Sequence, residues 1–334
     1  MAFDRWSDTG IVADLDDVLL PGTVLKNGQY LIRSFLGSGG FGNTYLASDP
    51  HNRAVVLKEC FVPELCRRQQ GHVLPRSEAH RLNLSKVIRS FLDEGALLAS
   101  LSHPNIVRAH QAFQENGSAY VVLDYVKGHD LQDLIDTDSP LLTPTRIVAM
   151  TRKLVSALRH LHDRGWLHCD ISPDNVCLRN DEDPVLIDFG SARKCVDGIG
   201  QPNAGFSMVK DGYSPHELYA PDAPCGPHSD IYALGATLYH AVSGVAPVDS
   251  QTRRTALIEG CPDPLPRLVG RAQGYPAGVL ASIDTALSVR VAGRHASAQA
   301  WLRTLAASAA TDRGDVLLLR GIRVPPAAGV QLHA

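Results

Sequence analysis

The 334-residue sequence lacks an excess of charge of either sign, because 32 Lys and Arg stand against 35 Asp and Glu, giving a formal net charge of -3. No strong basic field therefore argues for nucleic acid or an anionic membrane as a partner. The chain has no apolar run near the roughly 18 residues of a membrane span. Its N-terminal residues lack the basic-then-apolar pattern of a signal peptide. We expect a soluble, cytoplasmic protein without a membrane span.

The seven cysteines are also uninformative about metal binding, since none forms a CxxC pair and their number is odd. This pattern fits reduced thiols in a cytosolic protein better than a disulfide framework. Internal repeats and low-complexity blocks are absent. The remaining composition, 44% hydrophobic and 20% charged, is that of an ordinary globular protein. The length admits one large bilobal domain or two smaller ones.

Three polar residues between positions 166 and 190 have the most informative spacing. Asn175 follows Asp170 by five residues, and Asp188 follows Asn175 by thirteen. The short apolar runs 176–178 and 185–189 predict a hairpin that brings the two polar loops side by side. Their hard oxygen ligands leave room for phosphate oxygens and suit Mg²⁺. The alternative is three polar residues in unrelated surface loops.

A second motif is a run of glycines between two β-like segments in residues 30–47. Glycine permits positive φ and close backbone approach, so a hairpin of this kind can cover a polyphosphate. The same G-x-G-x-x-G spacing marks dinucleotide-binding folds, but there it opens a helix. Here residues 43–46 favour a strand, which indicates a hairpin lid. The glycines are Gly37, Gly39, Gly40 and Gly42.

Two charged residues lie within apolar patterns. Lys58 interrupts the run 54–59, and Glu94 lies on the apolar face of a predicted helix over 84–101. A buried charge is costly unless it has a partner. We therefore predict that Lys58 and Glu94 pair with each other. The alternative is that Lys58 lies on an edge strand and points to solvent.

These motifs, with His168-Cys169-Asp170 before Asn175 and Asp188-Phe189-Gly190 after it, resemble those of bacterial serine/threonine protein kinases of the eukaryotic (Hanks) type. The resemblance covers about residues 30–310. It implies an α+β, bilobal protein-kinase fold, with a small β-rich lobe (28–124) and a larger helical lobe (125–310). A leader (1–27) and a tail (311–334) would lie outside this domain, the leader being mobile.

The resemblance also implies ATP and Mg²⁺, with Mn²⁺ as an alternative metal. Asp170 would accept or orient the proton of the substrate hydroxyl, while Asn175 and Asp188 hold the metal. Lys58, held by Glu94, would orient the α- and β-phosphates. Thr44 stands where the family usually has valine. The implied nucleotide-binding residues are Leu36, Gly37, Ser38, Gly39, Gly40, Phe41, Gly42, Thr44, Val56, Lys58, Leu123, Asp124 and Val126.

Two residues of the catalytic loop depart from the family pattern. Cys169 replaces the arginine that usually gathers a phosphorylated activation loop, so activity is expected not to need that phosphate. Ser172 replaces a lysine that contacts the γ-phosphate, which removes a cation beside the transition state. Lys210 stands where the family has a threonine facing Asp170, and we predict that it supplies the missing charge. The alternative is a solvated loop lysine.

Other features of the second half fit a platform for a protein substrate. Glu217 ends a Ser-Pro-His-Glu segment, and the family pairs this glutamate with an arginine, here Arg294. The run 230–244 is apolar nearly all round, which predicts a buried central helix. Ser207, Tyr213 and Ser214 are candidate modification sites.

The resemblance leaves two other classes of function. A pseudokinase that binds nucleotide or partners without transfer is supported by Ser172 alone. A small-molecule phosphotransferase could share the aspartate–asparagine loop, but the Glu217–Arg294 pair argues against it. The expected partners are ATP and protein substrates. The insert 60–86, expected to be largely solvated, and the tail 311–334 are candidate sites for a regulatory partner.

Overall fold

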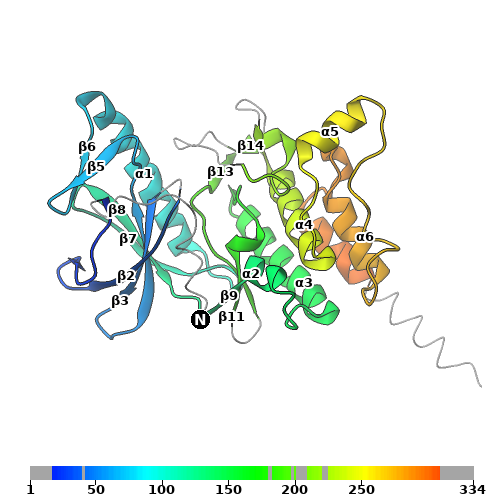
Figure 1. The fold of residues 1–334 in the computed structure, drawn as a ribbon, viewed down its shortest axis with the longest axis horizontal. Helices are drawn as coiled ribbons and strands as arrows, with labels where there is room; N and C mark the ends of the chain where they lie inside the picture. Colours follow the sequence, from blue (N-terminus) through cyan, green and yellow to red (C-terminus); the bar gives the residue numbers. More distant parts are fainter. Residues whose placement is uncertain are drawn as a thin grey trace, which may run out of the picture.

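A computed structural model describes residues 17–39, 42–179, 183–196, 199–200, 209–219 and 225–308 of the chain. They form two lobes that lie side by side, a strand-rich one coloured blue to cyan and a largely helical one coloured green to orange (Figure 1). The predicted bilobal α+β fold is confirmed. Among the described residues, no helix is both long and apolar enough to cross a membrane.

The small lobe is an antiparallel sheet of six strands in the order β1-β2-β3-β4-β8-β7. Helix α1 (Glu78–Ser100) packs on one face of this sheet through Phe91 and Leu98, while Tyr45 and Leu57 belong to a second core on the other face. Both faces are therefore covered, as the alternation along the strands requires. The strands are β1 (Val24–Leu25), β2 (Tyr30–Gly39), β3 (Gly42–Ser48), β4 (Ala54–Cys60), β7 (Ala109–Glu115) and β8 (Ser118–Asp124).

The segment before residue 28 is part of this lobe, not of a separate leader. Strand β1 pairs with β2, and Leu19 and Leu25 are buried in the second core. The backbone N–H of Leu19 also donates to the hydroxyl of Tyr45 at 3.1 Å. The prediction of a mobile leader is therefore wrong for residues 17–27, because the β1–β2 pairing and the buried side chains of Val18, Leu19 and Leu25 hold them on the lobe. Residues 1–16 lie outside the described part.

The insert after β4 is folded, although most of its side chains are exposed, as expected of a largely solvated segment. Strands β5 (Cys66–Gln69) and β6 (His72–Pro75) form a hairpin, and α1 begins at Glu78, six residues before the predicted start. The apolar residues of the insert are scattered among charged ones, so no periodicity reveals the core they form. Those with little exposure are Phe61, Val62, Cys66 and Val73.

The large lobe is built around α4 (Pro227–Ser243), which is buried along nearly its whole length, as predicted. Helix α3 (Pro144–His162) begins after a capping residue, Thr143, whose side chain accepts from the backbone N–H of Arg146. Residues 298–308 are helical as well. The remaining helices are α2 (Leu131–Asp136), α5 (Ser250–Ile258) and α6 (Ala277–Ala286).

Short strands place the catalytic segments at the junction of the lobes. The predicted hairpin is present as β11 (Val176–Arg179) paired with β12 (Pro184–Leu186), and β9 (Gly128–Asp130) pairs with β11 on its other side. A single 3-10 turn, η3 (Pro173–Asn175), precedes β11. Farther along the chain, β10 (Trp166–Leu167) pairs with β13 (Arg193–Val196), which pairs in turn with β14 (Ile199–Gly200).

Candidate active site

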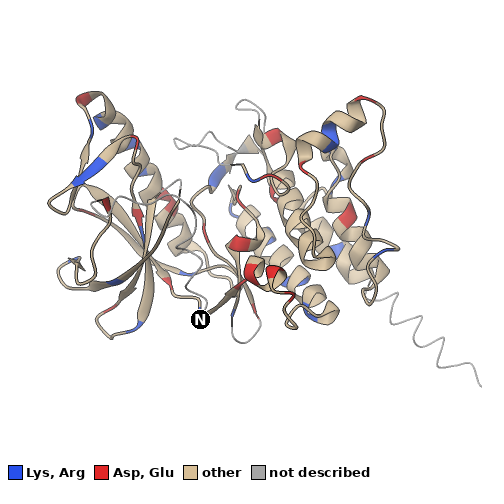
Figure 2. Ribbon diagram, in the orientation of Figure 1, with Lys and Arg blue, Asp and Glu red and all other residues tan. Residues whose placement is uncertain are grey.

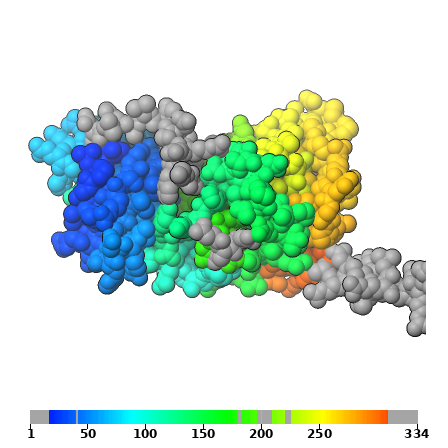
Figure 3. All heavy atoms as spheres, turned by 60° about the horizontal axis from the view of Figure 1, so that its bottom comes forward, coloured from blue at the N-terminus to red at the C-terminus, as the bar shows by residue number. Residues whose placement is uncertain are grey.

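A cleft between the lobes is lined by about half of the predicted site residues, although Glu94, Asp170, Ser172 and Lys210 are not among them; Figure 3 shows the two lobes as packed atoms. Of the predicted nucleotide-binding and metal-binding residues, the cleft is lined by Leu36, Thr44, Val56, Lys58, Leu123, Asp124, Val126, Asn175 and Asp188. The cleft lining does not include Gly37, Ser38, Gly39 and Gly42, which belong to the β2–β3 hairpin. Gly40 and Phe41 lie outside the described residues.

Sequence reasoning missed several apolar wall residues of the cleft, among them Val107, Cys177 and Ile187. Ile187 directly precedes Asp188, and Cys177 lies on β11 directly below the catalytic loop. Side chains alternate between the two faces of a strand, so the predicted strand β11 could have pointed to Cys177 once the face that lines the cleft was known. Burial raises the pKa of the Cys177 thiol to about 12, so this wall of the cleft is uncharged.

The backbone of the catalytic loop is held by Asp230, a completely buried carboxylate at the start of α4. Its oxygens accept from the backbone N–H groups of His168 at 2.9 Å and Cys169 at 2.8 Å. His162 lies 2.8 Å from the same carboxylate. Cys169 has a φ of 63°, a conformation that costs a non-glycine residue of order 1 kcal/mol. The Asp230 contact stabilises that strained residue directly before Asp170.

Asp170 is fixed from two sides. Its backbone N–H lies 3.4 Å from Nδ1 of His168, a buried ring whose pKa falls to about 4 because of desolvation and which is therefore a neutral acceptor. The side-chain amide of Asn175 donates to the backbone carbonyl of Asp170 at 2.8 Å and to its Oδ2 at 3.0 Å. Burial raises the pKa of Asp170 to about 6, although Lys210 acts in the opposite direction.

Lys58 forms an ion pair with Asp188 rather than the predicted pair with Glu94. Burial opposes ionisation of Asp188, but Lys58 and the backbone N–H of Gly190, 3.0 Å from Oδ1, hold its pKa below the usual value. Glu94 stays close enough for Lys58 to lower its pKa, yet desolvation dominates and raises that pKa to about 8. Lys58 and Glu94 lie near each other, but Lys58 forms its ion pair with Asp188 instead of with Glu94.

The donor set suits a divalent cation held jointly with phosphate oxygens. The side-chain nitrogen of Asn175 donates to Asp170, so the side-chain oxygen of Asn175 is the atom that could bind a metal. Asp188 adds a carboxylate. Mg²⁺ binds through one or two such oxygens plus substrate phosphates and does not need a dedicated cage. In keeping with this, no group of three or more His, Cys, Asp or Glu side chains in the described part of the chain could hold a metal.

Lys210 reaches the catalytic loop from the activation segment. Its Nζ lies 2.8 Å from Oγ of Ser172, 2.8 Å from Oδ2 of Asp174 and 3.4 Å from Oδ1 of Asp170. The structure thus brings together Ser172 and Lys210, two of the positions at which this chain departs from the family pattern. Asp170 and Asp174 give the ammonium group an acidic environment, and Figure 2 shows further acidic positions along α2.

The model of the protein kinase domain matches residues 30–263 of the chain, which include every catalytic motif described above. The chain belongs to the protein kinase family. It is 30% identical to the serine/threonine-protein kinase PknJ of Mycobacterium bovis, over 84% of this chain and 45% of PknJ. It is also 30% identical to the serine/threonine-protein kinase PrkC of Bacillus subtilis, over 68% of this chain and 32% of PrkC.

A solved structure described as the apo form of PpkA-294 has the same fold, with a TM-score of 0.72 and 30% sequence identity. The alignment covers 86% of this chain and 99% of that one. The chain spans less than half the length of the curated kinases named above. Its similarity to them concerns the kinase domain.

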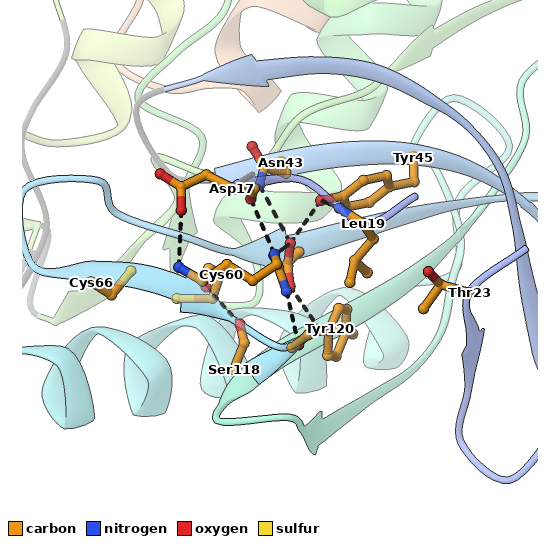
Figure 4. Close-up of polar contacts among 12 residues, drawn as sticks. Asp17, Leu19, Thr23, Asn43, Tyr45, Cys60, Cys66, Ser118 and Tyr120 are labelled. Atoms are coloured by element: carbon orange, nitrogen blue, oxygen red, sulfur yellow. Dashed lines mark hydrogen bonds and ion pairs between the residues drawn. The ribbon is translucent and has the colours of Figure 1, made fainter. Parts of the chain in front are cut away.

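Within this kinase domain, Glu59 is a buried residue that sequence reasoning missed. Strand alternation puts Lys58 on the cleft face of β4 and Glu59 on the opposite face, beside its cross-strand neighbours Asn43 and Tyr120. The hydroxyl of Tyr45 donates to this carboxylate at 2.8 Å, and that of Tyr120 donates at 2.7 Å. Figure 4 shows the side chains of Asn43, Tyr45 and Tyr120 gathered around this carboxylate, with the contacts as dashed lines.

The cation that balances Glu59 comes from the insert. Arg68, on β5, places Nη2 2.6 Å from Oε2 of Glu59, and neither side chain is more than 4% exposed. The guanidinium also donates to the backbone carbonyl of Asp17 at 3.2 Å, and Oδ1 of Asp17 accepts from the Arg68 backbone N–H at 2.9 Å. The charge of Glu59, one residue from Lys58, therefore attaches both the insert hairpin and the first described residues to the sheet.

The predicted pair of Glu217 and Arg294 is present and nearly buried. Arg294 forms two hydrogen bonds with the carboxylate, at 2.6 Å and 3.2 Å, and Ser229 Oγ donates to the same group at 3.0 Å. Burial opposes ionisation of Glu217, but Arg294 keeps its pKa below the usual value. This fork-like geometry fixes the end of the activation segment against the start of α4.

Proposed function

We propose that this chain is a serine/threonine protein kinase that transfers the γ-phosphate of ATP to hydroxyl groups of protein substrates. The observation that carries the proposal is that Lys58, Asn175 and Asp188 line one cleft between the lobes, with Asp170 hydrogen-bonded to Asn175 beside it. The order of these residues and the family membership of the chain give the same assignment.

In this mechanism Asp170 accepts or orients the proton of the attacking hydroxyl. Its pKa of about 6 leaves it mostly ionised at neutral pH and closer to the operating pH than an ordinary aspartate. Asn175 holds that carboxylate in place, while Lys58 orients the α- and β-phosphates. Mg²⁺, or Mn²⁺ in its place, would neutralise phosphate charge when held by Asn175 and Asp188.

The adenine would lie between the apolar walls of the cleft, formed by Leu36, Val56, Leu123 and Val126. Thr44 covers the same space from β3, in agreement with its substitution for the usual valine. The glycines of the β2–β3 hairpin, with Ser38, would lie over the phosphates through their backbone. Glu94 is close enough to influence Lys58 and is proposed to take over the lysine when phosphates occupy the site.

We further propose that a phosphate on the activation segment is not required. The position that usually carries arginine is Cys169, which is buried in an apolar cluster with Leu167 and Cys225. Ser207 lies outside the described residues, and Ser214 is only 6% exposed. Tyr213 is half-buried, with its hydroxyl 2.7 Å from His240 Nδ1. The proposed sites for a regulatory partner are the insert, where Leu74 and Leu82 are exposed, and the tail, which lies outside the described residues.

The test is transfer from labelled Mg²⁺-ATP to the chain itself and to a generic basic protein, with Asp170→Asn as the inactive variant. We expect transfer that disappears in the variant and phosphoserine or phosphothreonine in the product. If the wild-type chain binds ATP but transfers nothing, it is a pseudokinase, the alternative that Ser172 supports. Transfer to small molecules only would identify a small-molecule phosphotransferase.

A further inference from the structure

We propose that Lys210 is the lysine that contacts the transferred phosphate in this active site, and that the activation segment supplies it in place of the catalytic loop. This inference rests on the proposed kinase function. It concerns a catalytic residue and a way of controlling it that the matched motifs do not assign.

The geometry places the ammonium group beside the reacting centre. Nζ of Lys210 lies 2.8 Å from Oγ of Ser172, the buried residue that replaces the usual lysine, and 3.4 Å from the catalytic carboxylate of Asp170. The positive charge of Lys210 therefore lies next to Ser172, the position where the family has its lysine. It is supplied by the activation segment and not by the catalytic loop.

The surroundings keep this group charged and leave one of its donors with a longer contact than the others. Burial favours neutral lysine, but Asp170 and Asp174 outweigh it and raise the pKa of Lys210. An ammonium group has three donors. Two of them have good partners in Ser172 and Asp174 at 2.8 Å, while the third faces Asp170 at a longer 3.4 Å. That third donor is the one that can turn to a phosphoryl oxygen.

The backbone of Lys210 is fixed by a tight loop that docks on the large lobe. Its N–H donates to Oγ of Ser214 at 2.9 Å, and its carbonyl accepts from the N–H of Ser214 at 2.8 Å. Ser250, at the start of α5, donates to the carbonyl of Ser214 at 2.8 Å. The cation is consequently in place only when this part of the activation segment is docked on the large lobe.

A purely structural role would use the same contacts, with Lys210 bridging the activation segment and the catalytic loop. The two roles differ in what restores activity. A structural bridge has to span both segments, whereas a catalytic cation can come from either one. Ser172 lies within hydrogen-bonding distance of Lys210 Nζ. A lysine at 172 could therefore use the space freed by shortening the side chain at 210.

The experiment compares four variants in the phosphate-transfer assay, with kcat, the KM for ATP and the unfolding temperature measured for each. Lys210→Ala and Lys210→Gln should each lower kcat by about 10²–10³-fold, the usual effect of removing one transition-state charge contact. The unfolding temperature should stay close to that of the wild type. Ser172→Lys combined with Lys210→Ala should regain at least about tenfold of the lost kcat. Lys153→Ala, at a lysine that pairs with Asp183 outside the cleft, is the matched control.

Several results would overturn the proposal. One is a kcat within about twofold of wild type for Lys210→Ala, since a transition-state contact is worth far more. A second is full activity of Lys210→Gln, which keeps a hydrogen-bond donor but no charge. The third is a folded double variant with no recovery. If that variant fails to fold, Lys210→Gln against the wild type decides the question. An inactive wild-type chain would instead refute the proposed function itself.

Discussion

Gly42 is the glycine of the β2–β3 hairpin that has no room for a side chain. A Cβ at this position would lie 1.8 Å from the backbone oxygen of Glu59, and its φ of 143° disfavours other residues. Gly39, in the same hairpin, has nothing within 4 Å of such an atom. The two glycines look alike in the sequence and differ in packing.

We expect Gly42→Ala to destabilise the protein by more than about 1 kcal/mol, because neither backbone can move away without breaking the β3–β4 pairing. The KM for ATP should rise, since the same hairpin covers the phosphates. Gly39→Ala is the control and should be nearly neutral in both denaturant unfolding and ATP kinetics. Equal effects for the two substitutions would show that backbone freedom, not the contact with Glu59, governs this hairpin.

Individual residues also show where sequence reasoning stops. Spacing was enough to predict that Asp170, Asn175 and Asp188 meet. The apolar patterns showed that Lys58 and Glu94 are enclosed. They could not show that Lys58 reaches Asp188 instead, because the choice between two carboxylates depends on side-chain geometry. The left-handed backbone of Cys169 had no signal either, since cysteine is not among the residues that favour it.

At the scale of elements, the insert hairpin depends on one buried ion pair. Arg68→Met would leave Glu59 without its cation, and breaking a buried pair from one side costs about 3–5 kcal/mol. We expect this loss in denaturant unfolding, together with a raised KM for ATP, because Glu59 is adjacent to Lys58 on β4.

The double variant Glu59→Gln with Arg68→Met should be more stable than Arg68→Met alone, because the uncompensated charge is removed. Arg81→Met, at an exposed i,i+3 pair with Glu78 on α1, is the control and should change little. A double variant no more stable than Arg68→Met would mean that the packing of the arginine stem, not its charge, holds the hairpin.

Elements with a clear pattern of apolar residues or glycines were predicted well, and those held by tertiary contacts were not. Helix α4 and the strands around the glycines matched their patterns. The β5–β6 hairpin and the extra turns of α1 did not, because their stability comes from Arg68 and a few scattered apolar residues. The folding of residues 17–27 was missed for the same reason, because β1 is held by its pairing with β2 and not by a pattern within its own sequence.

For the whole molecule, the ion pair of Lys58 and Asp188 joins the small lobe to the large one. Nucleotide and metal that use the same two residues should therefore stabilise both lobes together. We expect Mg²⁺ and ATP to raise the unfolding free energy by about 2.7 kcal/mol at a ligand concentration 100 times Kd. Chelation of Mg²⁺ should remove most of that gain.

The measurement is thermal unfolding with ATP, with and without Mg²⁺. Asp188→Asn should lose the dependence on Mg²⁺, whereas Asp163→Asn, at an exposed residue of the large lobe, should keep it. A shift of the same size with and without Mg²⁺ in the wild-type protein would contradict a metal site at Asp188.

The Glu217–Arg294 pair has a consequence for folding during synthesis on the ribosome. Its two members are 77 positions apart, so Glu217 leaves the ribosome long before the arginine that neutralises it. The described sheet of the small lobe, by contrast, uses only residues up to 124. Domains of a growing chain fold N-terminal first. The small lobe can therefore close early, while the substrate platform must wait for the last part of the kinase domain to be made.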